Sequence, residues 1–202
     1  MRKTKYLFDA IVRQKKSVTY YALDLSEDTL RQGVEEMASA FPSIHVVGLL
    51  GTYDDSLAWI NENLPNKRKT VLWLGSSIGN FTREDALNFV DSLKSQAMGV
   101  GDQFLIGIDR RNDSAKIELA YNDPAGITRD FIMNGLSHIN KILGKPSFEK
   151  DAFEYVSLYN SIEGRHEAYY KSKKNQTIHV GKTGVTVDLK LGELIHIEYS
   201  HK

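Results

Sequence analysis

Short apolar runs that alternate with segments of helical periodicity are the feature that most constrains the fold of this chain. The runs cover residues 17–25, 44–50, 70–74 and 104–108, and their length and β-branched and aromatic content predict strands. Helical spacing predicts helices over 3–14, over about 27–41 behind an N-cap at Ser26, over 54–63 and after Thr82. Apolar strands alternating with amphipathic helices are typical of a parallel sheet covered on both faces. We therefore predict an α/β fold for this half of the chain.

The pattern changes at about Asp151. Short strands joined by turns are predicted over residues 153–160, 165–172, 177–180, 186–189 and 194–199, one of the turns lying at 181–184. They indicate antiparallel β structure, and residues 124–143 form a predicted helical connection to it. We expect a core over residues 1–122, followed by a helical connection and β-rich lobe over 123–202.

Composition narrows the class of protein. The chain has 26 basic and 26 acidic residues, and this balance argues against nucleic acid or a membrane surface as main partners. No apolar stretch approaches the roughly 20 residues of a membrane span, and cysteine is absent, which fits a reducing compartment. The six histidines show no spacing typical of metal ligands. We expect a cytoplasmic enzyme without a metal.

Polar and glycine residues follow the predicted strands. Ligands of open parallel sheets bind beyond the carboxyl ends of the strands, where this chain has Asp24, Gly51-Thr52-Tyr53, Gly75-Ser76-Ser77 and Asp109. Asp24 suits either a ribose-binding acid or an acid at a helix N-terminus. The segment LGSSIGNF (74–81) suits either a ligand-lining loop or a plain turn, and it matches neither G-x-G-x-x-G nor a P-loop.

Several segments, in order, resemble one family. They are RKTKYLFDAI, YYALDLS, GTYDD, LWLGSSIGNFTREDA, IGIDRRND, AYNDPAGIT, INKILG, EGRHEAYY and GELIHIEYSHK. Together they resemble the histidine-specific S-adenosylmethionine (SAM)-dependent methyltransferases, which trimethylate the α-amine of histidine in ergothioneine biosynthesis. A fungal branch of that family methylates 4-dimethylallyltryptophan in ergot alkaloid pathways, and YYALDLS and EGRHEAYY are most similar to fungal members. The resemblance implies a Rossmann-like SAM-binding core with a β-rich substrate lobe.

The resemblance also implies roles for particular residues. Toward the cofactor, Lys3 lies near the SAM carboxylate and Asp24 binds the ribose. Thr52 and Tyr53 flank the adenine, with Thr52 replacing the usual acid, and Gly51 belongs to the same cofactor-binding set. Toward the substrate, the implied set is Gly75, Asn80, Tyr121, Ala168, Glu198 and Ser200.

Within the implied substrate set, Asn80 and Tyr121 hold the carboxylate, while Glu198 and Ser200 recognise the imidazole ring. Ser200 can serve its ring nitrogen either as donor or as acceptor. Ala168 replaces a larger side chain of bacterial members. No residue is assigned to covalent or acid–base catalysis, because methyl transfer from a sulfonium needs mainly a positioned, neutral amine.

The family pattern extends beyond this sequence at both ends. The first strand, its glycine-rich loop and an N-terminal helical region precede the RKT segment in relatives, and further strands follow Lys202. We therefore expect a fragment with weak or no activity of its own, and the resemblance leaves open a fused or separate sulfoxide synthase. Histidine is the favoured substrate; a prenylated tryptophan, or a non-catalytic remnant that binds a ligand or partner, are the alternatives.

Overall fold

The computed structural model describes residues 2–181 and 183–202, without the side chain of Arg2, so part of the predicted turn at 181–184 lies outside the described residues. The chain divides into two compact units. Unit 1 comprises the residues up to Leu74 together with Asp85–Ile106, and unit 2 comprises Gly75–Glu84 together with Gly107–Lys202. Within the described residues, no helix combines the length and apolar character needed to cross a membrane.

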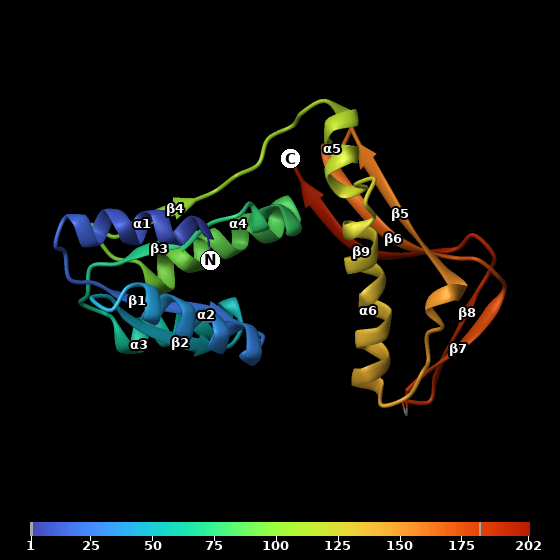
Figure 1. Ribbon diagram of the computed structural model, residues 1–202, viewed down its shortest axis with the longest axis horizontal. Coiled ribbons are helices and arrows are strands. Elements are labelled where there is room, and N and C mark those ends of the chain that lie inside the picture. The colour runs from blue at the N-terminus through green and yellow to red at the C-terminus, as the bar shows by residue number, and fades with distance from the viewer. Residues whose placement is uncertain (1, 182) are drawn as a thin grey trace. The chain divides into compact units, whose positions relative to one another are not determined.

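Unit 1 alternates strands and helices, as the apolar runs predict (Figure 1). Its elements are α1 (Arg2–Arg13), β1 (Thr19–Asp24), α2 (Glu27–Ala40), β2 (His45–Leu50), α3 (Tyr53–Asn63), β3 (Thr70–Trp73), α4 (Arg83–Ser92, from Asp85 onward), a π-helical turn η2 (Leu93–Ala97) and β4 (Gln103–Ile106). Ser26 caps α2 by accepting a hydrogen bond from the Thr29 amide, which confirms the predicted N-cap.

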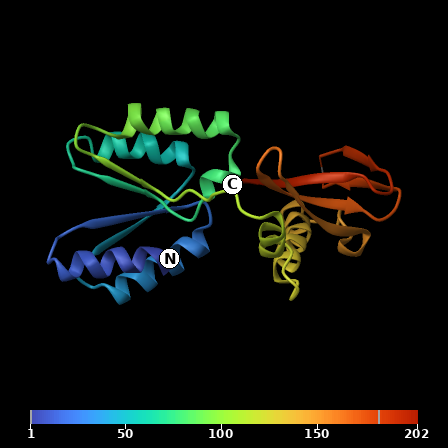
Figure 2. The same ribbon diagram turned by 90° about the horizontal axis from the view of Figure 1, so that it is seen from above.

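The parallel strands of unit 1 form two sheets rather than the single sheet that the sequence predicts. β1 pairs with β2 and β3 pairs with β4, both in parallel. Each pair is a strand–helix–strand unit. The apolar runs in the sequence predict these local units, but they do not predict whether one pair of strands hydrogen-bonds to the other. Figure 2 shows α1 and α2 on one face of these strands and α3 and α4 on the other.

Two apolar clusters hold unit 1 together. Phe8, Met37 and Ile44 form the first, between α1, α2 and the β1–β2 sheet, and Leu57, Leu93 and Ala97 form the second, between α3 and η2. Burial of large aliphatic and aromatic side chains of this kind stabilises a fold by roughly 1.5–3 kcal/mol each. The first cluster therefore holds the amino ends of β1 and β2 against α1 and α2.

Unit 2 contains antiparallel sheets and two helices. The helices are α5 (Ser114–Tyr121) and α6 (Ile127–Leu143), and 3₁₀ turns lie at η1 (Ser77–Asn80) and η3 (Lys150–Ala152). Strands β5 (Phe153–Asn160), β6 (Arg165–Ser172) and β9 (Leu194–His201) form one sheet, and β7 (Gln176–Val180) and β8 (Val185–Leu189) form another. The predicted antiparallel β structure after residue 151 is confirmed, whereas α5 was not predicted.

Both helices lie against one face of the β5–β6–β9 sheet (Figures 1 and 2). The Tyr155 hydroxyl donates a hydrogen bond to the Tyr121 carbonyl at the end of α5, 2.9 Å away. The Tyr170 hydroxyl donates to the Ile132 carbonyl of α6, beside the buried residues Met133 and Leu136. We call this helix-covered surface the inner face of the sheet.

A β-bulge interrupts the pairing of β6 with β9. Ala168 lies opposite Glu198, but the next residue, Tyr169, lies opposite His196, so the register shifts by one residue at Ile197. Beyond the bulge, Tyr170 pairs with Ile195, and Ile195 packs against the apolar cluster under α6. A bulge of this kind changes which side chains of a strand share a face.

Candidate functional site

The predicted cofactor residues Asp24 and Gly51 meet where β1 and β2 end. The Gly51 amide donates to the Asp24 carbonyl at 3.2 Å, so the two residues lie side by side at the carboxyl edge of the sheet. The half-buried Asp24 carboxylate accepts a hydrogen bond from the Ser26 amide at 2.9 Å. One carboxylate oxygen therefore serves the start of α2, and a carboxylate carries a second oxygen that is able to accept from a ligand hydroxyl.

Thr52 and Tyr53 begin α3 at the same edge. The Thr52 hydroxyl accepts from the Asp55 amide at 3.1 Å, and the Thr52 amide donates to the Asp55 carboxylate at 2.8 Å, a capping box. The Tyr53 ring packs 5.4 Å from the rings of Trp73 and Phe89 and is 41% exposed. Thr52 thus has a structural task in the helix cap, while Tyr53 presents part of an aromatic ring at the surface.

Lys3 is placed differently from the other predicted cofactor residues. It lies in the first turn of α1 with an exposed side chain. Asp24 and Gly51 are brought together by the pairing of β1 with β2, and Thr52 and Tyr53 follow Gly51 directly in the sequence. Lys3 belongs to the same unit but lies in α1 and not at this edge.

Three of the predicted substrate residues lie on the paired strands β6 and β9, together with a fourth residue, His166. Ala168 lies opposite Glu198, and His166 lies opposite Ser200. Alternation along a strand places all four on the same face, and that face is the inner face because Tyr170, two residues from Ala168, reaches α6. Ala168 and His166 are fully buried, Ser200 is buried and Glu198 is half-buried.

Tyr121 is held over this face from three directions. Its carbonyl accepts from Tyr155, and its ring stacks on His166 with centroids 3.9 Å apart and planes 14° apart. Its hydroxyl lies 2.9 Å from the Ser200 hydroxyl. A tyrosine fixed at backbone, ring and hydroxyl is a rigid recognition element.

Lys202 completes the cluster. Its ammonium donates to the hydroxyls of Tyr121 and Ser200, the latter at 3.0 Å. It also pairs with the Asp109 carboxylate at 3.0 Å, and its side chain is only 4% exposed. Its amide continues the sheet by donating to the Gly164 carbonyl at 2.8 Å. We refer to Tyr121, Ser200, Lys202 and Asp109 as the hydroxyl–ammonium cluster.

The ionisable groups of the inner face are shifted by burial and by Lys202. Burial, together with the Lys202 charge, lowers the pKa of His166 to about 4, so that its ring is neutral at pH 7. Burial raises the pKa of the Glu198 carboxyl, partly offset by Lys202 and His196. The pKa of Lys202 is raised because its bonds to Tyr121 and Asp109 outweigh burial.

Buried His166, which stacks on Tyr121, pairs with partly buried Ser157. The His166 Nε2 lies 2.8 Å from the Ser157 hydroxyl, while Nδ1 is buried without a hydrogen-bond partner among the described residues. An unpaired buried N–H costs more than an unpaired acceptor, so the tautomer with hydrogen on Nε2 is favoured. His166, Ser157 and Lys202 were missed because their importance comes from partners that are distant in sequence or on another strand.

The glycine-rich loop packs against the end of β9. A Cβ on Gly79 would lie 2.7 Å from the His201 carbonyl oxygen, so only glycine permits this approach. Gly75 has a φ of +97°, which side chains disfavour. Asn80 lies in the same turn with an exposed side chain. The loop thus contacts β9 at His201, the residue between Ser200 and Lys202.

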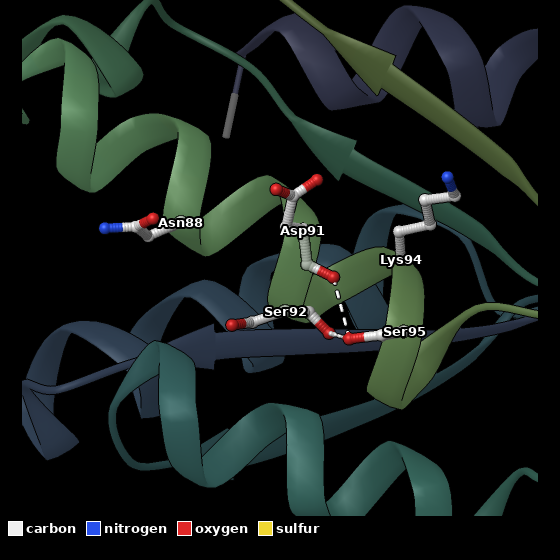
Figure 3. Close-up of a pocket in the computed structure, with 5 residues that line it drawn as sticks. All are labelled: Asn88, Asp91, Ser92, Lys94 and Ser95. Carbon is white, nitrogen blue, oxygen red and sulfur yellow. Dashed lines mark hydrogen bonds between the residues drawn. The ribbon is translucent and has the colours of Figure 1, made fainter.

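A separate shallow hollow lies on unit 1. Figure 3 shows its lining, which comprises Asn88, Asp91, Ser92, Lys94 and Ser95. The Ser95 hydroxyl donates to the Asp91 carbonyl at 2.8 Å, as serine commonly does within a helix. None of the predicted site residues lines this hollow, and we assign it no ligand.

The predicted residues separate by unit. The five cofactor residues all belong to unit 1, and the six substrate residues all belong to unit 2. Comparison with known proteins then decides the family, because the model of the histidine-specific, SAM-dependent methyltransferases matches residues 1–202. The chain belongs to this family.

Curated relatives agree with the family. "Ergothioneine biosynthesis protein 1" of Neurospora crassa is 40% identical over 182 residues, covering 88% of this chain and 20% of the relative. "N-methyltransferase imqF" of Aspergillus flavus is 34% identical, covering 90% of the chain and 50% of the relative. "Histidine N-alpha-methyltransferase" of Mycobacterium tuberculosis is 30% identical, covering 99% and 61%. The chain therefore spans between about a fifth and three fifths of the length of these relatives.

Proposed function

We propose that this methyltransferase chain serves SAM-dependent N-methylation of the α-amine of an amino acid, with L-histidine as the favoured substrate. The observation that carries the proposal is the inner face of unit 2, where the half-buried carboxylate of Glu198 and the hydroxyls of Ser200 and Tyr121 gather over buried Ala168. A face that combines an acid with fixed hydroxyls is suited to a small ligand that has several nitrogen and oxygen atoms.

The residues of unit 1 fit the cofactor. Bound SAM supplies an electrophilic methyl group on a sulfonium. The Asp24 carboxylate is suited to accept hydrogen bonds from ribose hydroxyls, and Gly51 lets a ligand approach the backbone beside it. The partly exposed ring of Tyr53 offers an apolar surface to the adenine. We propose this edge as the SAM-binding part of a Rossmann-like core.

The residues of unit 2 account for recognition of histidine. The Glu198 carboxyl is proposed to accept from one imidazole N–H, and Ser200 lies two residues farther along β9 on the same face. An amino acid without a matching ring would leave the half-buried Glu198 carboxylate without this partner, which costs about 1–3 kcal/mol. The chain contributes orientation of a neutral amine rather than covalent or acid–base catalysis.

Tyr121 and Asn80 are proposed to hold the substrate carboxylate. The Tyr121 and Ser200 hydroxyls lie 2.9 Å apart and are hydrogen-bonded to each other. When the ligand binds, this hydrogen bond is replaced by one from Tyr121 to the ligand carboxylate and one between Ser200 and the ligand ring. This exchange is nearly balanced when each hydroxyl gains a ligand partner for the one it gives up.

A methyl-transfer assay tests the proposed function. Labelled SAM is incubated with the chain, and with a version extended at both ends, in the presence of L-histidine or 4-dimethylallyltryptophan. We expect label in histidine, chiefly with the extended version. If only the tryptophan derivative became labelled, the substrate would be 4-dimethylallyltryptophan and not histidine.

Titration of SAM against the 202-residue chain separates an enzyme from a remnant. A SAM-binding core gives saturable binding, and we expect this result. Absence of both SAM binding and methyl transfer in either version would overturn the proposal in favour of a non-catalytic protein.

A further inference from the structure

We propose that Lys202 is a substrate-positioning residue, which turns the hydroxyls of Tyr121 and Ser200 into hydrogen-bond donors toward the bound amino acid. This inference rests on the proposed function and names the residue that sets the polarity of its site. It applies to any α-amino acid substrate, because every such substrate has the carboxylate that Tyr121 is proposed to hold.

The number of hydrogen bonds decides between direct binding and positioning. An ammonium has three N–H donors, and Lys202 directs one each at Tyr121, Ser200 and Asp109. All three are in use within the protein, and the side chain is 4% exposed. Lys202 therefore acts on the substrate through its partners rather than by direct contact.

The proton count shows what Lys202 changes. A lysine ammonium only donates, so both hydroxyl oxygens accept from it. The two hydroxyl protons are then available, one of them bridging Tyr121 and Ser200 when no ligand is bound. When an amino acid binds, Tyr121 is able to donate to the carboxylate and Ser200 to the bare ring nitrogen, while Glu198 accepts from the other ring nitrogen.

Charge supports the same direction of donation. The Lys202 ammonium lies 4.6 Å from the centre of the Tyr121 ring, and a nearby cation favours a negatively charged ligand at the hydroxyls. Asp109, which balances Lys202, is 46% exposed and so is partly screened by water. The positive charge of Lys202 is buried on the inner face, and the compensating negative charge is at the surface.

The test compares Lys202→Met with Lys202→Arg and with Lys171→Met as a matched control. Lys171 forms an exposed ion pair with Glu154 in the same sheet, 2.8 Å apart, away from the cluster. Calorimetric titration with L-histidine and with histamine, which lacks the carboxylate, measures binding by the 202-residue chain. Methyl transfer by the extended version supplies KM and kcat for the same variants.

We expect Lys202→Met to weaken histidine binding about tenfold, the effect of losing one hydrogen bond to a charged group. Histamine binding changes less, so the preference for histidine over histamine shrinks. In Lys202→Met, KM rises by a larger factor than kcat falls. Lys202→Arg recovers part of the preference for histidine because it keeps the positive charge. Lys171→Met binds both ligands as the unsubstituted chain does.

The pKa of His166, measured without ligand, tests whether the Lys202 charge acts on the inner face. Lys202 lowers the pKa of His166, so Lys202→Met should raise that pKa, as followed by the histidine ring resonances in NMR. An unchanged His166 pKa contradicts the inferred arrangement.

The outcomes separate this inference from the proposed function. Equal loss of histidine and histamine binding in Lys202→Met would show a structural role and overturn the inference alone, as would unchanged binding of both. A chain that binds neither histidine nor SAM overturns the proposed function, and the inference with it.

Discussion

Single residues on the inner face of unit 2 have more than one task. Tyr121 closes hydrogen bonds with Tyr155 and Ser200 and covers the ring of His166. His166 stays neutral at pH 7 because burial and Lys202 lower its pKa to about 4, so it supports Tyr121 without adding a second positive charge. The chemistry of this face therefore depends on residues that never need to touch the substrate.

Gly79 gives the sharpest prediction at the scale of one residue. Replacing it by alanine puts a methyl group 2.7 Å from the His201 carbonyl oxygen, so the loop or the end of β9 must move. We expect Gly79→Ala to lower the free energy of unfolding by about 1–3 kcal/mol, the usual cost of overpacking.

Urea unfolding measures this loss, with Gly99→Ala as the control. The nearest atom to a Cβ at Gly99 would be 3.9 Å away, which is an ordinary contact. A stability of Gly79→Ala equal to that of Gly99→Ala would show that the loop is not packed on β9 as described.

At the scale of elements, strands were easier to predict than short helices. The bounds of β5 and β6 agree with the sequence prediction at every end, because strongly patterned segments end at clear turns. Helix α5 has apolar residues at 115, 117 and 119, a period of two that resembles a strand. The segment becomes helical because Asp113 caps it and its Ile117 is buried.

The site was predictable only in part, for a related physical reason. The loop and strand-end positions of Asp24, Gly51 and Gly75 follow from local pattern. The partnership of Lys202 with Tyr121 joins residues 81 positions apart, and no local periodicity encodes it. The break between the β1–β2 and β3–β4 sheets has the same origin, since pairing between distant strands is set by packing.

The turn before β4 makes the stability of unit 1 depend on pH. The Asp102 carboxylate accepts from the amides of Gly99 and Lys69 and pairs with the Lys69 ammonium at 2.9 Å. These interactions, that with Gly99 first, lower its pKa from 3.8 to about 2. A carboxyl whose pKa is lowered by folding stabilises the fold above its unfolded pKa, and this stabilisation is lost as pH falls through about 2.

We therefore expect Asp102→Asn to lower the free energy of unfolding at pH 7 by about 2 kcal/mol, the scale of hydrogen bonds to a charged group. The difference from the unsubstituted chain should shrink between pH 4 and pH 2, as measured by urea unfolding across that range. Asp9→Asn, at an exposed position of α1, is the control. A difference that stays constant with pH would show that the Asp102 charge has no part in it.

At the scale of the whole molecule, the proposed cofactor residues and the proposed substrate residues belong to different units. Cofactor residues lie in unit 1 and substrate residues lie in unit 2. We expect a change to one set to weaken chiefly the binding of the ligand that this set is proposed to contact.

Asp24→Asn and Glu198→Gln test this separation, because both keep the size of the side chain. We expect Asp24→Asn to weaken SAM binding about tenfold and to leave histidine binding unchanged, since a ribose loses a charged acceptor. Glu198→Gln should do the reverse. Calorimetry with each ligand alone measures both, and a loss of the same ligand in both variants would contradict the assignment.

The bulge at Ile197 gives β9 two functions on one face. Without the bulge, a strand of this sequence would alternate regularly and would place His196, not Ile195, on the face that Glu198 and Ser200 share. With it, Ile195 enters the apolar cluster under α6 while Glu198 and Ser200 stay on the inner face. Deletion of Ile197 would restore regular alternation with Ile195, Glu198 and Ser200 still on the inner face, so the bulge absorbs one residue of chain length without altering that face.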